Sequence, residues 1–427
     1  MIALNPARRL AALAALAALA LALTACGGSG EPEGGGDGNV TLRVSVWNLA
    51  KTPEFTALFD AFQQANPTIK IQPVDILADD YPDKVTTMLA GGDTTDVITM
   101  KNVIDYSRYS SRGQLLDITD LAKGADTAKL AGLPAFDVKG KYFALPYRQD
   151  FWLLYYDKKA FQKAGVTMPG QLTWDAYAQL AQKLTHEEGG KKVYGTYHHT
   201  WRSVVQAVAA AQTGGDLIGG DYSFFADQYA LALGLQKAGA TLDFGTATSQ
   251  KSDYRTQFET GATAMMPMGT WYISGILEAK KKGATDVDWA LAPMPQRPGG
   301  TEVTTFGSPT AFAVNAKAEH ADAARKFVRF AASQAGAEAI TKVGVVPALQ
   351  TPEITKAYFS ADGMPADELS KKAFEPGKVV LEMPVSDKAS DIDTILNEEH
   401  QLIMVGEKSA ADGIRSMNER VKTEALN

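Results

Sequence analysis

The sequence is almost free of cysteine, since Cys26 is the single one among 427 residues. A lone cysteine can form neither an intramolecular disulfide nor a multi-cysteine zinc site, so neither kind of cross-link can stabilise the fold. Stability must therefore come from the burial of apolar side chains. Because a chain of this length exceeds what one hydrophobic core usually serves, we expect two domains.

Common catalytic and metal-binding motifs are also missing. The chain has no G-x-S-x-G elbow and no P-loop, and the glycine-rich stretch near residue 34 precedes every expected strand, unlike a dinucleotide fingerprint. No two of the five histidines have the i, i+4 spacing of a helical zinc site. We expect no metal, no cofactor and no enzyme activity, although carboxylate pairs formed only in space remain open.

Positive charge is scarce. The sequence has 42 basic and 49 acidic residues, a formal net charge of −7. Residues 1–25 contain Arg8, Arg9 and no acidic residue, so a chain that begins at Cys26 has a net charge of −9. A nucleic-acid partner is not expected, because backbone binding needs clustered positive charge. Electrostatic adhesion to an anionic membrane is disfavoured for the same reason.

Long hydrophobic runs are absent apart from residues 10–23, which are only alanine and leucine. These fourteen residues fall short of the roughly 20 that a membrane-spanning helix needs. They follow Arg8-Arg9 and end in small residues, which is the layout of a secretory signal. Residues 1–25 are therefore predicted to be a signal peptide. Two arginines alone do not decide between export routes.

The residues that follow this signal resemble the bacterial lipobox. Leu23-Thr24-Ala25 leads directly into Cys26, and in lipoproteins such a cysteine receives a diacylglycerol and becomes the first residue of the mature chain. The resemblance implies a lipid anchor on Cys26 at the outer face of the bacterial cell membrane. The alternative is an ordinary signal with a stray cysteine. Residues 26–39 are rich in glycine, so we expect them to form a flexible tether.

Strand and helix patterns alternate from Val40 onward. Alternating apolar residues predict a strand ending at Trp47, Thr52-Pro53 opens a helix that Asn66-Pro67 ends, and a second strand, a second helix and a strand at 97–100 follow. This order within sixty residues predicts a parallel sheet with right-handed crossovers, hence an α/β fold. Further strands are expected at 142–145, 151–156, 265–268, 289–292 and 310–314, and helices at 173–184, 201–212, 392–403 and 414–421.

Aromatic residues mark the ends of the predicted strands. Trp47 ends the first strand, where ligands collect in open parallel sheets, and Trp271 follows the strand at 265–268. Sugars present flat C–H faces ringed by hydroxyls, which fit an aromatic plane with polar groups at its edge. The alternative is a structural aromatic at a domain edge. Candidates that combine both features are Trp47, Asn48, Arg148, Asp150, Trp201, Arg202, Trp271 and Tyr272, whereas Trp152, Trp174 and Trp289 are assigned to packing.

Several segments, in this order and spacing, resemble the extracellular solute-binding proteins of ABC importers, particularly the carbohydrate-binding group that includes maltodextrin-binding proteins. The resemblance covers nearly all of residues 40–427. It is carried by TLRVSVWN, AGGDTTDVITM, GKYFALPYRQDFWLLYYDKKAFQKAGV, LTWDAYAQLAQKL, FETGATAMMPMGTW, WALAPMP, TFGSPTAFAVNAKAEHADAARKFVRFAAS and VGVVPAL. It implies a type II periplasmic-binding-protein-like fold of two α/β lobes joined by three crossings, with the ligand between them.

The resemblance also implies where the lobes divide. The crossings are expected near 150–154, near 306–309 and after Pro347. Lobe 1 would consist of residues 40–150 and 309–347, and lobe 2 of 151–308 and 348–427.

Site residues follow by the same resemblance. Asp150 would supply a polar contact and Trp271 would stack on a sugar ring, with Trp47 or Asn48 and the loop at Gly307-Ser308 facing the cleft. Trp201 and Arg202 fall where relatives vary. The sequence departs from the family at Thr95, Asp157 and Ser308-Pro309, and the proline would restrict the second crossing.

The expected partners are a carbohydrate ligand, an ABC permease with its ATPase subunits and the membrane through the anchor, and the chain is expected to be a monomer. Three alternatives stay open. The chain could be an exported glycoside-processing enzyme, or it could deliver its ligand to a receptor as a sensor. Arg148 and Arg202 also leave room for an acidic or phosphorylated solute.

Overall fold

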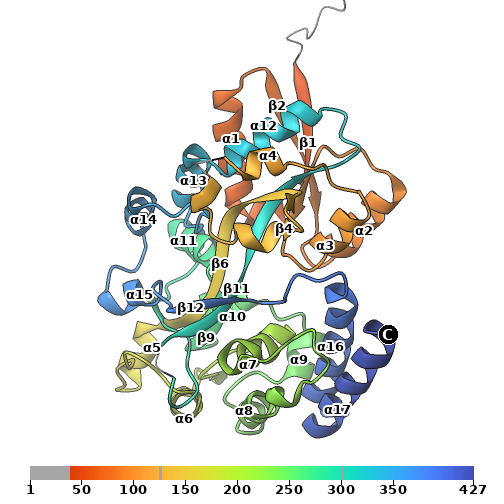
Figure 1. Cartoon of the computed structure of the whole chain (residues 1–427). Helices are drawn as coiled ribbons and strands as arrows, with labels where there is room; N and C mark the ends of the chain where they lie inside the picture. Colours follow the sequence, from red (N-terminus) through yellow and green to blue (C-terminus); the bar gives the residue numbers. More distant parts are fainter. Residues whose placement is uncertain (1–38, 125–126, 301) are drawn as a thin grey trace, which may run out of the picture. The chain divides into compact units, whose positions relative to one another are not determined.

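The computed structural model describes residues 39–124, 127–300 and 302–427 (Figure 1). The predicted signal peptide, the anchor at Cys26 and the tether up to residue 38 lie outside the described residues. Within those ranges, no helix has both the length and the apolar character that crossing a membrane requires.

The first sixty residues of the fold confirm the predicted alternation. They form β1 (Val40–Trp47), α1 (Pro53–Ala65), β2 (Ile69–Ile76), α2 (Tyr81–Gly91) and β3 (Val97–Met100). Strand β1 pairs in parallel with both β2 and β3, as right-handed crossovers require. The apolar residues that recur at strand spacing in β1 and at helical spacing in α1 are buried. Such spacing places them on one side of each element. The carboxyl ends of these parallel strands therefore lie at the same edge of the sheet.

Strand β6 (Ala144–Asp157) is one continuous buried strand. The separate strands expected at 142–145 and 151–156 are therefore wrong in this respect, because polar residues interrupt the apolar pattern but not the backbone ladder. The first half of β6 pairs with β11 (Thr304–Val314), and its second half pairs with β9 (Met265–Gly269) and β10 (Trp289–Ala292).

Strand β11 also begins earlier than the expected residue 310. Its first residues pair with β12 (Lys378–Leu381) and its last with β3. Gly307 and Ser308, expected in a loop, lie inside this strand opposite Phe151 and Asp150. The loop was implied by the family resemblance, whereas here the glycine lies within β11 and permits its close approach to β6.

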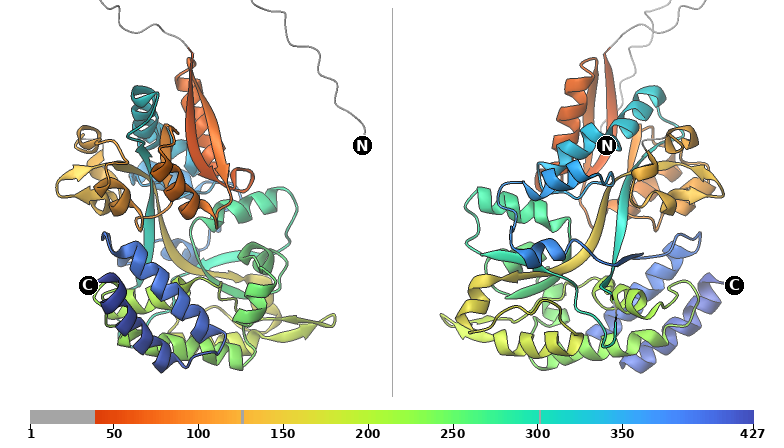
Figure 2. Two further views of the ribbon diagram at one scale, coloured as in Figure 1. Left: turned by 90° about the vertical axis from the view of Figure 1, so that its right-hand side faces the viewer. Right: turned by 60° about the vertical axis from the view of Figure 1, so that its left-hand side comes forward.

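Three segments pass side by side between the lobes. Strands β6 and β11 are two of them, and Figure 2 shows them joining the upper and lower parts of the fold. The third is 346–348, which lies along β6: the Gln149 amide donates to Val346 at 3.1 Å and the Ala348 amide donates to Tyr147 at 2.9 Å. The crossings are expected near 150–154, near 306–309 and after Pro347, and the division into lobes at these positions stays a prediction.

The hydrophobic cores change over at the same segments. One core uses residues of 42–147 and 311–354. A second core uses residues from Phe151 to Phe306 and a few from 346–373, and a third joins 205–244 with the C-terminal helices. The second and third cores lie in the lower lobe of Figure 1. Burial of apolar surface thus holds each lobe together separately.

The remaining helices confirm the expected C-terminal pair and the helix at 173–184. The helix expected at 201–212 is broken, however: a 3₁₀ turn, Arg202–Val204, precedes α7. The helices are α3 (Tyr106–Ser111), α4 (Thr119–Ala122), α5 (Lys158–Lys163), α6 (Trp174–Leu184), α7 (Gln206–Thr213), α8 (Ala226–Lys237), α9 (Phe244–Ser249), α10 (Tyr254–Glu259), α11 (Tyr272–Lys281), α12 (Ala321–Ala331), α13 (Gln334–Thr341), α14 (Pro352–Phe359), α15 (Glu368–Lys372), α16 (Ala389–Met404) and α17 (Ala410–Arg420).

Two short hairpins complete the strands. They are β4 (Asp137–Val138) with β5 (Lys141–Tyr142), and β7 (His186–Glu188) with β8 (Lys191–Val193).

Candidate functional site

A buried charged cluster lies where β6 crosses between the lobes. Arg148 forms ion pairs with Glu54, in the first turn of α1, and with Asp150, whose Oδ2 lies 2.8 Å from Arg148 Nε. Residues 148 and 150 are two apart on a strand, so their side chains lie on the same face. The Thr270 hydroxyl, at the end of β9, donates to Asp150 Oδ1 at 2.9 Å. A chain of polar contacts thus joins α1 of the upper lobe to β9 of the lower lobe.

This cluster is shielded from water on every side. Glu54 is 1% exposed and Asp150 3%. Burial raises the pKa of both carboxyls, and the adjacent Arg148 guanidinium opposes that rise. Since a buried charge is tolerated only when paired, the three side chains depend on one another.

Trp47 lies beside this cluster but is only 6% exposed. Its ring packs edge-on against Phe55 and Tyr81, and the guanidinium of Arg148 and the ammonium of Lys101 each lie 5.7 Å from its centre. Trp47 therefore belongs mainly to the core of the upper lobe.

Asn48, the next residue, is half-buried and left-handed, with φ 43°. Its side-chain oxygen accepts a hydrogen bond from the Ala78 amide at 3.2 Å. This contact ties the end of β1 to the segment after β2.

Trp271 is held as a platform at the end of β9. A Cβ added to Gly269 would lie 1.9 Å from the indole ring, so only glycine lets the ring lie flat on the backbone there. Trp152 contacts the same ring edge-on, with centroids 5.6 Å apart. The ring is half-exposed, whereas the adjacent Tyr272 is fully buried and donates its hydroxyl to Glu259 at 3.2 Å.

Trp201 extends this aromatic surface. It is 36% exposed, and its ring lies 6.1 Å from that of Trp271, 5.8 Å from Tyr254 and 4.3 Å from His199. Together these rings form an aromatic cluster on the lower lobe, defined here as Trp201, Trp271, Tyr254 and His199. Burial lowers the pKa of His199 to about 4, although the carboxylates of Asp253 and Asp79 raise it.

Arg202 points away from the aromatic cluster, into the lower lobe. Its guanidinium donates to Asp393 of α16 and to Gln206, and it is 3% exposed. The neighbouring Ser203 donates to Glu382, which follows β12. These contacts explain the 3₁₀ turn at this point, because they direct successive side chains to two different elements.

The second crossing meets the first at Gly307. A Cβ there would lie 2.0 Å from the carbonyl oxygen of Asp150 and 2.8 Å from Cα of Phe151. Ser308, next in β11, is half-buried and pairs with Asp150. Both residues thus lie directly beside the charged cluster.

A model of the bacterial extracellular solute-binding proteins matches residues 47–338 of this sequence. The chain belongs to this family. A sugar transporter from Rhizobium etli, solved in an open conformation, has a TM-score of 0.76 and 35% identity over 90% of this chain and 99% of its own. The multiple sugar-binding protein of Streptococcus mutans is 21% identical over 343 residues, 76% of this chain and 74% of the relative.

Other relatives align over less of the chain or at lower identity. The mannitol-binding protein of Pseudomonas aeruginosa is 28% identical over 159 residues, so the alignment spans 36% of each chain. The maltodextrin-binding domain of Bdellovibrio bacteriovorus, bound to maltotriose, has a TM-score of 0.73 at 17% identity and shares the fold. These likenesses confirm the predicted two-lobe α/β fold.

Sequence reasoning missed several residues near the site of this solute-binding protein. Lys101, directly after β3, donates to the Ala78 carbonyl at 2.7 Å, and burial lowers its pKa to about 8. Glu382 of the lower lobe acts electrostatically on Lys101. The position of Lys101 at a strand end could have indicated a site residue from the sequence. Nothing in the sequence around Glu382 or Tyr254 indicated one.

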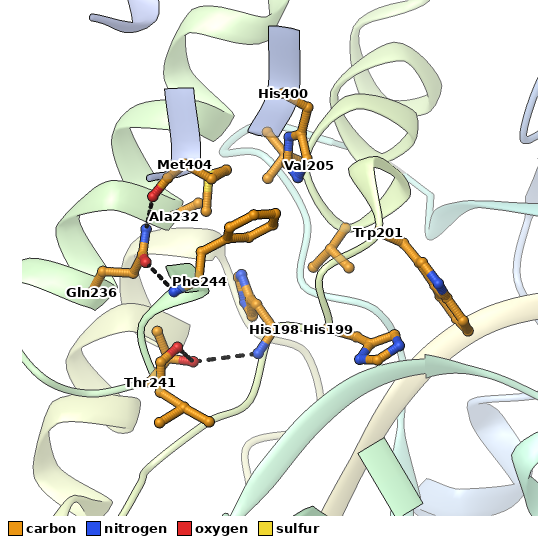
Figure 3. A pocket seen from close by; sticks show the side chains of 12 residues that line it. His198, His199, Trp201, Val205, Ala232, Gln236, Thr241, Phe244, His400 and Met404 are labelled. Atoms are coloured by element: carbon orange, nitrogen blue, oxygen red, sulfur yellow. Dashed lines mark hydrogen bonds between the residues drawn. The ribbon is translucent and has the colours of Figure 1, made fainter. Parts of the chain in front are cut away.

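A small hollow, partly open to solvent, lies next to the aromatic cluster (Figure 3). His199 and Trp201 lie at one side of it, and His198 and His400 face it from the other. Burial lowers the pKa of His198 to about 4 and that of His400 to about 3, so both are neutral at pH 7. The hollow is thus lined by apolar and neutral groups.

Proposed function

We propose that this protein captures a sugar or short oligosaccharide between its lobes and delivers it to the permease of an ABC importer. The observation that carries the proposal is the half-exposed ring of Trp271, fixed beside a hydrogen-bonded charged cluster at the crossing. Aromatic planes with polar groups at their edge suit sugar rings. The Rhizobium etli sugar transporter and the Streptococcus mutans multiple sugar-binding protein support the same class of ligand.

The proposed roles follow the geometry. Trp271 and Trp201 stack on the ligand, Ser308 supplies a polar contact from the second crossing, and Asn48 contributes from the upper lobe. Asp150, expected from the sequence to contact the ligand, is buried and paired. It supports the site from behind together with the other buried or paired residues, Trp47, Arg148, Arg202 and Tyr272, and Gly307 keeps the crossings close.

The proposed mechanism uses the two lobes, 40–150 with 309–347 and 151–308 with 348–427. Ligand engages one lobe, closure completes the site from the other, and the closed form docks on the permease, which the ATPase subunits drive. Shifting a hinge from mostly open to mostly closed needs about 5 kcal/mol of differential affinity, which fits within the roughly 8 kcal/mol of a micromolar ligand. No chemical step is required, so no catalytic residue is assigned.

Attachment to the membrane is proposed through a lipid on Cys26. A glycine-rich tether of this length has a root-mean-square reach of about 20 Å, which lets a monomeric binding unit turn beside the membrane. Mass spectrometry of the exported protein tests the anchor, since lipidation adds a diacylglycerol to Cys26. An exported chain with an unmodified thiol would contradict it.

The first test is a melting-temperature screen against mono-, di- and oligosaccharides, because a ligand selective for the folded state raises the melting temperature. A saturable shift with intact ligand recovered afterwards supports the proposal. A ligand returned cleaved would point to a glycoside-processing enzyme, and no shift with any sugar would contradict sugar capture.

Replacing Trp271 by alanine tests the stacking platform. We expect the binding free energy to weaken by about 2 kcal/mol or more, roughly 30-fold in Kd, because a central aromatic contact is lost. Titration calorimetry with the sugar found in the screen measures this loss. Tyr142→Ala, a half-buried aromatic of the upper lobe outside the site, is the control. An unchanged Kd for the Trp271 variant would remove this ring from the site.

A further inference from the structure

Three arginines lie near the site, and they differ in their partners. Arg148 is paired with Glu54 and Asp150, and Arg202 with Asp393. Arg255, on α10, is half-buried but has no carboxylate oxygen within 4.0 Å anywhere in the described ranges. A partly desolvated guanidinium without an anionic partner is unfavourable unless another group supplies acceptors.

The position of Arg255 is held by its surroundings. Its guanidinium carbon lies 5.6 Å from the ring centre of Tyr254 and 5.9 Å from that of Tyr272. Arg255 Nη1 occupies the space beside Gly275 of α11, where an added Cβ would lie 2.0 Å away. Glycine destabilises a helix interior, so its presence at position 275 needs a reason. The room that it leaves for the Arg255 guanidinium supplies one.

Arg255 lies near the Trp271 platform, against the helix that begins next to Trp271. Gly275 follows Trp271 by four residues, so the two positions share one face of the helix. Tyr254, the neighbour of Arg255, belongs to the aromatic cluster. The charge of Arg255 also acts on the pKa of Glu54 in the upper lobe, lowering it against the dominant effect of burial.

We propose that Arg255 is a ligand-recognition residue of this site, donating its guanidinium N–H groups to adjacent hydroxyl oxygens of a neutral sugar stacked on Trp271. The inference rests on the proposed function and names the ligand class more closely. The planar guanidinium offers two parallel donors at a spacing that suits two neighbouring oxygens. Arg148 and Arg202 cannot do this, because their donors are engaged by carboxylates.

The charge balance of the site selects a neutral ligand over an acidic one. The charges that act on one another here are the carboxylates of Glu54, Asp150, Asp253 and Glu382 and the cations of Arg148, Arg255 and Lys101. Carboxylates are not outnumbered by cations in this set, so an acidic ligand would add a further negative charge beside them. Hydroxyl groups accept the same hydrogen bonds without that penalty.

The test compares variants of the exported chain in binding and in melting temperature. Arg255→Met keeps the aliphatic stem and removes the donors, and we expect at least a tenfold rise in Kd for the neutral sugar found in the screen. The ligand-free melting temperature should change little, because methionine keeps the aliphatic stem and Arg255 has no ion pair to lose within the described ranges. Arg415→Met, at an exposed arginine on α17, is the matched control and should leave Kd unchanged.

A second variant tests the Arg255 guanidinium without replacing Arg255 itself. Gly275→Ala places a methyl group where Arg255 Nη1 lies, so it should displace the guanidinium and raise Kd at least threefold. Gly234→Ala, in α8 with open space around the added Cβ, should leave Kd unchanged. Unaltered Kd in both Arg255→Met and Gly275→Ala, with sugar binding intact in the parent chain, would overturn the role of Arg255 alone.

The remaining outcomes separate the inference from the proposed function. If the parent chain binds no sugar in the screen, the proposed function fails and the role of Arg255 fails with it. If it binds glucuronic acid at least tenfold more tightly than glucose at pH 7, the neutral-ligand assignment is overturned. A preference for the neutral sugar that weakens in Arg255→Met supports both parts.

Discussion

At the scale of single residues, Arg148 shows how a buried charge can organise the centre of a fold. It is 7% exposed and contacts Glu54, Asp150 and the Thr310 hydroxyl, the last at 3.1 Å from Nε. Removing one member of such a cluster leaves the others buried and unpaired, which costs more than the ion pairs themselves contribute. The cluster is therefore sensitive to any single change.

We predict that Arg148→Met lowers the free energy of unfolding by about 3–5 kcal/mol, because two buried carboxylates lose their cation. Arg415→Met, which breaks an exposed i, i+3 pair with Asp412, should change it by less than about 1 kcal/mol. Urea denaturation of both variants measures the difference. Equal effects would mean that water reaches the cluster and compensates the charges.

At the scale of elements, β6 and β11 are packed so closely at the crossing that a side chain cannot fit between them. Gly307 approaches the backbone of Asp150 and Phe151, and backbone atoms cannot rotate out of the way as a flexible side chain can. A glycine inside a strand commonly marks such close approach. The crossing is thus a tight strand pair, and the proposed closure of the lobes would require it to bend.

We predict that Gly307→Ala destabilises the protein by about 1–3 kcal/mol, as overpacking does, and weakens sugar binding by altering the angle between the lobes. Gly91→Ala, where nothing lies within 4 Å of the added Cβ, serves as the control and should leave binding unchanged. Thermal unfolding and calorimetric titration together measure both effects. Wild-type stability in Gly307→Ala would show that the strands separate freely here.

At the scale of the whole molecule, buried neutral histidines link stability to pH. His400 of α16 accepts or donates at Nδ1 to the Tyr229 hydroxyl of α8, 3.0 Å away, and burial lowers its pKa to about 3. An unfolded histidine has a pKa near 6.5, so the unfolded chain binds more protons between these values. Stability from this group is complete above pH 6.5 and is lost as the pH falls towards 3.

We predict that lowering the pH from 7 to 5 costs about 2 kcal/mol through His400, by linkage between the two pKa values. His400→Gln retains a polar side chain but does not titrate, so its stability should fall less over the same range. The raised pKa values of the Glu54 and Asp150 carboxyls favour the folded state as the pH falls. This effect is the same in both proteins, so it cancels in the comparison. Parallel pH profiles of the two melting curves would contradict the prediction.

Local patterns predicted much of the fold. The alternation in β1, the proline start of α1 and the helical pattern of α6 each depend on neighbouring residues, so the sequence sufficed for them. The continuity of β6 could not be predicted, because its polar centre resembles a loop until Glu54 and Thr270 are brought to it. Similarly, the break before α7 depends on partners far along the chain.

The sequence by itself determined the fold family and, through its single cysteine, the absence of an intramolecular disulfide, because these follow from composition and from the order of local segments. Only the tertiary structure decided which charged groups are engaged. Arg148 meets Glu54 across 94 residues of sequence and Arg202 meets Asp393 across 191. Arg255 is left without such a partner in the described part of the chain. The energy of an ion pair depends on the distance between the two charges and on their burial, and the spacing of residues along the sequence determines neither.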